Sequence, residues 1–117
     1  LSLTTYEELL GHPKIGASWE GFVVEQLYAI TTSSEIYFWA AHSGAEIDIL
    51  YRKGGNRYGI EAKFSDAPRT TKSMRSCIET LDLKSLFIVY PGTRSYQLDK
   101  AISAIAIRDF QKTIESL

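Results

Sequence analysis

Residues 46–63 read Glu-Ile-Asp-Ile-Leu-Tyr-Arg-Lys-Gly-Gly-Asn-Arg-Tyr-Gly-Ile-Glu-Ala-Lys, and this stretch predicts a β-hairpin. Its Gly54-Gly55 dipeptide suits a two-residue primed turn, and β-branched and aromatic residues flank the dipeptide on both sides. We therefore expect one strand over Ala45–Lys53 and the next over Arg57–Ser65. The two strands are antiparallel neighbours in this interpretation.

A two-residue loop also fixes which side chains of the hairpin share a face. In that register Asp48 stands opposite Glu61, and Glu46 stands opposite Lys63. Opposed residues project from the same side of a sheet, so these four polar side chains lie together. The other side carries apolar residues that we expect in the core, namely Ile47, Ile49, Tyr51, Ile60, Ala62 and Phe64.

Two directly opposed carboxylates repel each other unless a cation lies between them. Hard divalent ions such as Mg²⁺ and Mn²⁺ take carboxylate and carbonyl oxygens as ligands. Asp48 and Glu61 are therefore candidate metal ligands, with Lys63 beside them to orient a water or stabilise developing charge. The alternative is a solvated face with cross-strand ion pairs worth about 0.2–1 kcal/mol each, which requires a longer loop and another register.

An amphipathic helix over residues 14–30 is predicted before the hairpin. Apolar residues recur there at helical spacing, at Ile15, Trp19, Phe22, Val23, Leu27 and Ile30. Glu20 lies at the border of this apolar stripe. We expect it to supply a further acidic group to the site, directly or through water.

The remaining segments alternate between strand and helix patterns. We expect a strand over Glu35–Ala40, a helix through Met74, Cys77, Ile78 and Leu81, a buried strand over Ser85–Tyr90, short strands over Tyr96–Leu98 and Ile102–Ile107, and a closing helix through Phe110, Ile114 and Leu117. The segment Ile102–Ile107 is also compatible with a helix. The order predicts an α/β sandwich with a central mixed sheet flanked by helices. We interpret residues 14–117 as one domain and residues 1–13 as a lead-in from an upstream domain.

The composition fits a globular cytoplasmic protein. Apolar residues make up 44% and charged residues 23% of the 117 residues. The apolar runs are too short to span a membrane. A single cysteine, Cys77, excludes an internal disulfide framework and a cysteine-rich zinc site, and it fits a reducing compartment.

The net charge of −1 gives no general attraction to nucleic acid. Any contact with DNA must then come from a local basic patch or from a bound metal. Arg69, Lys72 and Arg75 are the candidate phosphate contacts. The same three residues are also what the solvated face of an amphipathic helix would carry.

Three motifs resemble a known nuclease superfamily. They are Gly16-x-x-x-Glu20, then Ser43-Gly44-Ala45-Glu46-Ile47-Asp48, and then Ile60-Glu61-Ala62-Lys63-x-Ser65. The pattern resembles the PD-(D/E)XK superfamily, and most closely the uncharacterised C-terminal domain of bacterial and archaeal AAA-type ATPases. Ile47 stands where the superfamily pattern has proline.

The resemblance implies a restriction-endonuclease-like fold and a set of site residues. Asp48, Glu61 and the backbone carbonyl of Ala62 would bind Mg²⁺ or Mn²⁺, Lys63 would be the catalytic lysine, and Glu20 the helical acid. Glu46 and Ser65 are candidates for supporting positions around that site. No ATPase phosphate-binding loop occurs in this sequence, so the resemblance places an ATPase domain upstream in the full-length chain.

Three functional hypotheses follow from these observations. The first is a metal-dependent nuclease module acting on DNA. The second is a catalytically silent module of the same fold, which serves as an interaction or regulatory domain of the attached ATPase. The third is a homo-oligomer that pairs through the apolar strand Glu35–Ala40, since such edge strands invite pairing.

Overall fold

The computed structural model describes residues 15–32, 35–38 and 47–117 of the chain. The described elements are, in chain order, α2 (Ile15–Ile30), β1 (Ile36–Phe38), β2 (Ile49–Lys53), β3 (Asn56–Ala62), α3 (Lys72–Leu81), β4 (Ser85–Tyr90), β5 (Tyr96–Asp99), β6 (Ile102–Ala106) and α4 (Ile107–Glu115). This order of helices and strands confirms the predicted α/β class. The predicted lead-in of residues 1–13 and residue Glu46 lie outside the described residues.

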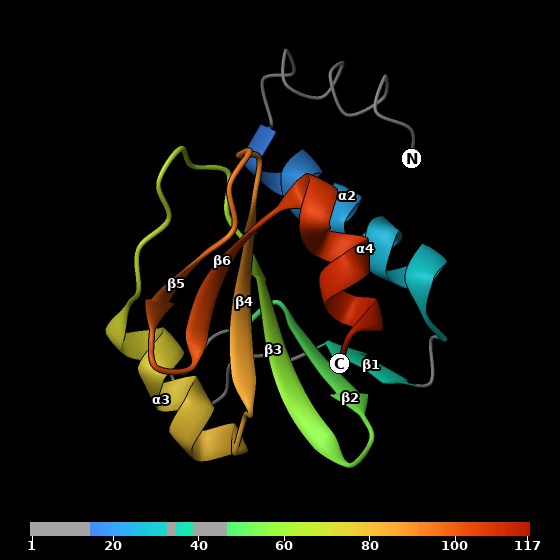
Figure 1. The fold of residues 1–117 in the computed structure, drawn as a ribbon, viewed down its shortest axis with the longest axis vertical. Coiled ribbons are helices and arrows are strands. Elements are labelled where there is room, and N and C mark those ends of the chain that lie inside the picture. The colour runs from blue at the N-terminus through green and yellow to red at the C-terminus, as the bar shows by residue number, and fades with distance from the viewer. Residues whose placement is uncertain (1–14, 33–34, 39–46) are drawn as a thin grey trace.

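The six described strands form one mixed sheet in the order β1-β2-β3-β4-β6-β5. The pairs β1–β2 and β2–β3 are antiparallel, and the pairs β3–β4 and β4–β6 are parallel. At the edge of the sheet, β5 pairs antiparallel with β6. A parallel neighbour requires a crossover connection, and α3 provides it between β3 and β4. Figure 1 shows α2 and α4 side by side on one face of the sheet and α3 on the other.

Both faces of the sheet are buried against helices. The core under α2 and α4 includes Trp19, Ile60 and Val89, and the core under α3 includes Cys77 and Ile88. Neighbouring residues of β4 therefore face different cores, which explains its uninterrupted apolar sequence. The indole Nε1 of Trp19 donates a hydrogen bond to the backbone carbonyl of Val89 at 3.1 Å, which fixes α2 to the middle of the sheet.

The hairpin has the predicted two-residue turn. The pairs run from Lys53 with Asn56 to Ile49 with Ile60, in the expected register. Gly54 and Gly55 have φ angles of +60° and +81°. Both values lie in the left-handed region that a primed turn needs and that glycine adopts at little cost.

The hairpin strands are shorter than predicted, and two side chains lie differently as a result. The chain bends at Asp48, so β2 begins only at Ile49, and strand alternation does not extend back to Ile47. Ile47 packs in the core under α3 instead of sharing a face with Ile49. β3 ends at Ala62, and Phe64 beyond it is 40% exposed rather than buried.

The predicted polar face of the hairpin is not a free surface. The core under α3 includes Leu50 of β2 and Leu86 and Ile88 of β4, on the face from which Glu61 projects. This face is covered because strands beside a parallel crossover are packed on both sides. Polar residues of this face lie at the two ends of the hairpin, with Glu61 near the end of β3 and Arg52 and Arg57 beside the turn.

The other element boundaries differ by a few residues. The described part of the predicted strand Glu35–Ala40 is β1 (Ile36–Phe38), and residues 39–40 lie outside the described residues. The ambiguous segment Ile102–Ile107 is a strand as far as Ala106, and α4 begins at Ile107. Among the described residues, no helix is long and apolar enough to cross a membrane.

Candidate functional site

The candidate site lies where β2 begins, β3 ends and the first half of α2 passes by. Asp48 precedes β2, and its Oδ2 accepts a hydrogen bond of 2.7 Å from the backbone N–H of Ala62. The last paired residues of this ladder are Ile49 and Ile60. The Asp48 carboxylate therefore accepts a hydrogen bond from β3 at a position beyond the last strand pair. Asp48 is held beside Glu61, although the two residues are not a strand pair.

Glu61 is the only charged residue that is buried among the residues whose exposure the structure describes, at 8% exposed. Its Oε1 lies 3.6 Å from Nζ of Lys63, and the Lys63 side chain is 50% exposed. Removing a carboxylate from water costs free energy unless the charge is paired or neutralised. A half-exposed lysine offsets that cost only in part, because solvent screens the pair.

The pKa values of two carboxyl groups in this site, Glu61 and Glu20, are raised. Burial, and then the charge of Asp48, raise the pKa of Glu61 to about 7, against the opposing effect of Lys63. Partial loss of water around Glu20, and then the charge of Asp48, also raise the pKa of Glu20. A side-chain hydrogen bond with Asp48 contributes to both shifts. The structure thus brings together all four predicted residues, Glu20, Asp48, Glu61 and Lys63.

The Ala62 carbonyl is directed to the same edge of β3. The backbone N–H of Lys63 bonds to the carbonyl of Val89 on β4 at 3.0 Å, so the Lys63 backbone faces β4. Backbone groups of successive residues in a strand point to alternate sides, so the N–H and C=O of Ala62 face away from β4. The N–H reaches Asp48 on that side, and the carbonyl points the same way.

These donors fit one class of metal ion better than another. In the part of the chain that the structure describes, no three His, Cys, Asp or Glu side chains are gathered as a group that could hold a metal. A zinc centre with three or four protein ligands therefore has no counterpart there. Mg²⁺ is commonly held by one or two carboxylates, with water and substrate phosphate completing the shell. Asp48, Glu61 and the Ala62 carbonyl match that donor set.

A cavity of about 230 Å³ adjoins Glu61 and Lys63, and it extends to the start of α3. Thr71, Ser73 and Met74 complete its lining. Thr71 caps α3, because its side chain accepts a hydrogen bond from the backbone N–H of Met74 at 3.1 Å. Sequence reasoning missed these lining residues, although a threonine three residues before an apolar helix position is a capping signal.

The remaining predicted residues lie outside the lining of this cavity, and Arg75 borders a separate hollow with Ile78 and Ile102. Ser65 is exposed, and its Oγ accepts a hydrogen bond from the backbone N–H of Ala67. Arg69 and Lys72 are exposed, and Nη1 of the exposed Arg75 donates to Oγ1 of Thr70 at 3.0 Å. Supporting roles for Ser65 and phosphate contacts for the three basic residues stay predictions.

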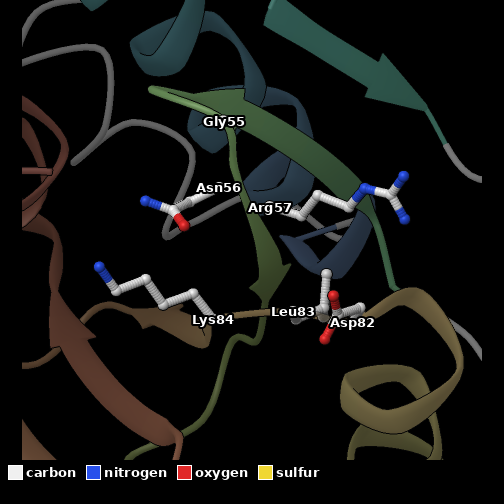
Figure 2. A pocket seen from close by; sticks show the side chains of 6 residues that line it. All are labelled: Gly55, Asn56, Arg57, Asp82, Leu83 and Lys84. Carbon is white, nitrogen blue, oxygen red and sulfur yellow. The ribbon is translucent and has the colours of Figure 1, made fainter.

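A second hollow lies at the other end of β3, beside the hairpin turn. It has a volume of about 320 Å³ and is lined by Gly55, Asn56, Arg57, Asp82, Leu83 and Lys84. Nη1 of Arg57 donates to the carbonyl of Leu81 at the end of α3. Figure 2 shows the Arg57 and Lys84 side chains pointing in opposite directions, so the two cations do not converge on one ligand.

Residues 15–110 match the family described as a domain of unknown function, DUF4143. The chain belongs to the DUF4143 family. The matched range contains Glu20, Asp48, Glu61 and Lys63. The family description assigns no activity to DUF4143 domains.

Two curated relatives of this DUF4143 chain are uncharacterized proteins of Mycobacterium bovis and Mycobacterium tuberculosis. Each is 42% identical over 94 residues, which is 80% of this chain. The same alignment covers 21% of each relative, so the chain spans about a fifth of their length. No solved structure matches the chain.

Proposed function

We propose that this DUF4143 domain is a metal-dependent nuclease module that hydrolyses phosphodiester bonds in DNA, with a restriction-endonuclease-like fold. The observation that carries the proposal is the buried Glu61, held next to Asp48 and 3.6 Å from the Lys63 ammonium group. A buried carboxyl group whose pKa is raised to about 7 beside a second acid is a candidate functional site. The mixed sheet with flanking helices supports the fold assignment.

Each residue has a distinct role in this proposal. Asp48, Glu61 and the Ala62 carbonyl hold Mg²⁺ or Mn²⁺, which when bound polarises a phosphate oxygen and lowers the pKa of water. Lys63 positions the attacking water and stabilises negative charge on the phosphate. Glu20 binds a water at the edge of the site through its carboxyl group. Arg69, Lys72 and Arg75 contact the backbone of the DNA.

The proposal extends to the longer protein of which such domains form part. The mycobacterial relatives are about five times as long as the aligned region. We propose that an AAA-type ATPase domain in the same chain delivers the nucleic acid to the nuclease site. The domain then acts at a site of ATP-driven movement rather than as a separate tight DNA binder, which agrees with its net charge of −1.

One observation favours a second candidate function. Oδ2 of Asp48 accepts a hydrogen bond from the backbone N–H of Ala62, so Asp48 has a structural role at the end of the hairpin. A silent interaction module would retain such a residue without any chemistry. The two functions differ in whether the domain cleaves DNA, and cleavage is measured directly.

The deciding experiment is a cleavage assay with Mg²⁺ or Mn²⁺ on linear, nicked and branched DNA. We expect metal-dependent cleavage by the wild type and a loss of about 100-fold or more in Lys63→Ala. The matched control is Lys84→Ala, which removes an exposed lysine at the other end of β3. Equal turnover by wild type and Lys63→Ala would contradict the role of Lys63. An inactive wild type on all three substrates would favour the silent module.

A further inference from the structure

We infer that the cavity between the end of β3 and the start of α3 binds a phosphate group of the DNA strand, next to the phosphate that is cleaved. This inference rests on the proposed function and adds a second phosphate contact to it. The cavity has a volume of about 230 Å³, and its lining includes Glu61 and Lys63 of the acidic site together with Thr71 and Ser73 at the start of α3. It therefore joins the acidic site directly to α3.

The strand pairing explains why these side chains face one cavity. Glu61 pairs with Ile88 of β4, and Ile88 belongs to the core under α3. The backbone N–H of Lys63 bonds to the carbonyl of Val89, so the chain continues beside β4 as far as Lys63. Residues two apart along a strand share a face, so Lys63 projects toward α3 as Glu61 does. Figure 1 shows α3 on this face, opposite α2 and α4.

The cavity offers hydrogen-bond donors of the kind that a phosphate group needs. Lys63 contributes a half-exposed ammonium group, and Thr71 and Ser73 contribute hydroxyl groups from the other side. Oγ1 of Thr71 accepts a hydrogen bond of 3.1 Å from the backbone N–H of Met74, which holds this oxygen in place. A hydroxyl group also carries a hydrogen, so Thr71 can donate to a ligand while it caps α3. Lysine and hydroxyl side chains commonly contact phosphate oxygens in complexes with DNA.

Glu61 determines when this cavity accepts an anion. Its Oε1 lies 3.6 Å from Nζ of Lys63, so the carboxylate competes with a phosphate group for the lysine. In the proposed function Glu61 is a ligand of a divalent cation, and its negative charge is then offset by that ion. Lys63 becomes available to the phosphate group as a result. Phosphate binding in the cavity should therefore be tighter with a divalent cation than without one.

The capping position allows a variant that changes the charge of the cavity and keeps α3 intact. Aspartate is at least as good an N-cap as threonine, so Thr71→Asp should preserve the helix while it adds a negative charge to the cavity wall. Ser73→Ala removes the other hydroxyl group and introduces a strong helix former. The matched control is Gln111→Glu, which adds the same charge at an exposed position of α4, on the opposite face of the sheet.

The experiment follows the backbone amide signals of Ser73 and Met74 by NMR. One titration uses inorganic phosphate with and without Mg²⁺, and the other uses a short oligothymidine without terminal phosphates in Ca²⁺, so that binding is followed without cleavage. We expect saturable shifts of both amides with both probes, and tighter binding of inorganic phosphate in Mg²⁺. Thr71→Asp should weaken both about tenfold or more, and Ser73→Ala about threefold or more. Gln111→Glu should stay within about twofold of the wild type.

The outcomes separate this inference from the proposed function. A wild type that cleaves DNA but shows no shift of these amides with either probe would overturn the phosphate subsite alone. Shifts with inorganic phosphate but not with oligothymidine would overturn its assignment to the DNA strand. Equal weakening in Gln111→Glu and Thr71→Asp, with both variants as stable to urea as the wild type, would also overturn it. Amide shifts with both probes in a wild type that cleaves no DNA would support the subsite and contradict the nuclease activity.

Discussion

The carboxylate of Asp48 accepts a hydrogen bond of 2.7 Å from the backbone N–H of Ala62, beyond the end of the β2–β3 ladder. This contact draws Asp48 to the end of β3, where Glu61 is already buried. The resulting repulsion between two carboxylates adds to the burial of Glu61 and raises its pKa to about 7. The folded chain therefore maintains an unfavourable concentration of negative charge, which a divalent cation would relieve.

The substitution Asp48→Asn should lower the pKa of Glu61. Asparagine retains a side-chain oxygen that can accept the hydrogen bond from the Ala62 N–H, but it carries no charge to oppose ionisation of Glu61. Burial is the largest cause of the raised pKa and remains, so the pKa should stay above the ordinary value of 4.5. NMR titration of the Glu61 carboxyl carbon measures this shift. An unchanged pKa would show that the two carboxyl groups do not interact.

The substitution Glu61→Gln should stabilise the fold at pH 8 but not at pH 4.5. A folded pKa of about 7, against an ordinary 4.5, means that the folded state holds a proton that the unfolded chain has released. Wild-type stability therefore falls as pH rises between these two values. Glu61→Gln should raise the free energy of unfolding by about 2–3 kcal/mol more at pH 8 than at pH 4.5. Urea unfolding at both pH values measures it, with the exposed Glu79→Gln as a control that should show no such change.

The hairpin turn should tolerate alanine poorly, unlike the first half of α2. Gly55 has φ of +81°, so Gly55→Ala should cost about 1–2 kcal/mol of unfolding free energy. Gly21 lies inside α2, and a Cβ there would meet no described atom within 4 Å. Gly21→Ala should therefore stabilise the protein by about 0.5–1 kcal/mol. Thermal and urea unfolding of both variants check the opposite signs, and a stabilising Gly55→Ala would contradict the primed turn.

The hairpin register and the order of the helices and strands could be predicted from the sequence. Gly54-Gly55 specifies a two-residue turn, and a turn of known length fixes every pair that follows it. The buried strand β4 and the amphipathic helices α2 and α3 were recognisable because hydrophobic periodicity is a local property of the chain. The candidate residues Asp48, Glu61 and Lys63 were selected from that register and Glu20 from helical spacing, although Asp48 lies in a bend outside the ladder.

The ends of the strands were not predictable in the same way. Asp48 lies in a bend because its side chain, and not a backbone carbonyl of the neighbouring strand, accepts the hydrogen bond from the Ala62 N–H. Which acceptor is used depends on tertiary geometry. The same bend reverses the side on which Ile47 packs. Phe64 was assigned to the core because periodicity was extended past Ala62, where β3 ends. Alternation carries no information beyond the last paired residue.

The most direct test of the metal site is calorimetric titration of the chain with Mn²⁺. We predict binding at millimolar concentration or tighter at pH 8, marked weakening at pH 5.5 where Glu61 is protonated, and loss in Asp48→Asn. The exposed Glu79→Gln should bind as the wild type does. Binding of equal strength in Asp48→Asn and wild type, or no binding by the wild type at pH 8, would contradict the assignment of Asp48 and Glu61 as metal ligands.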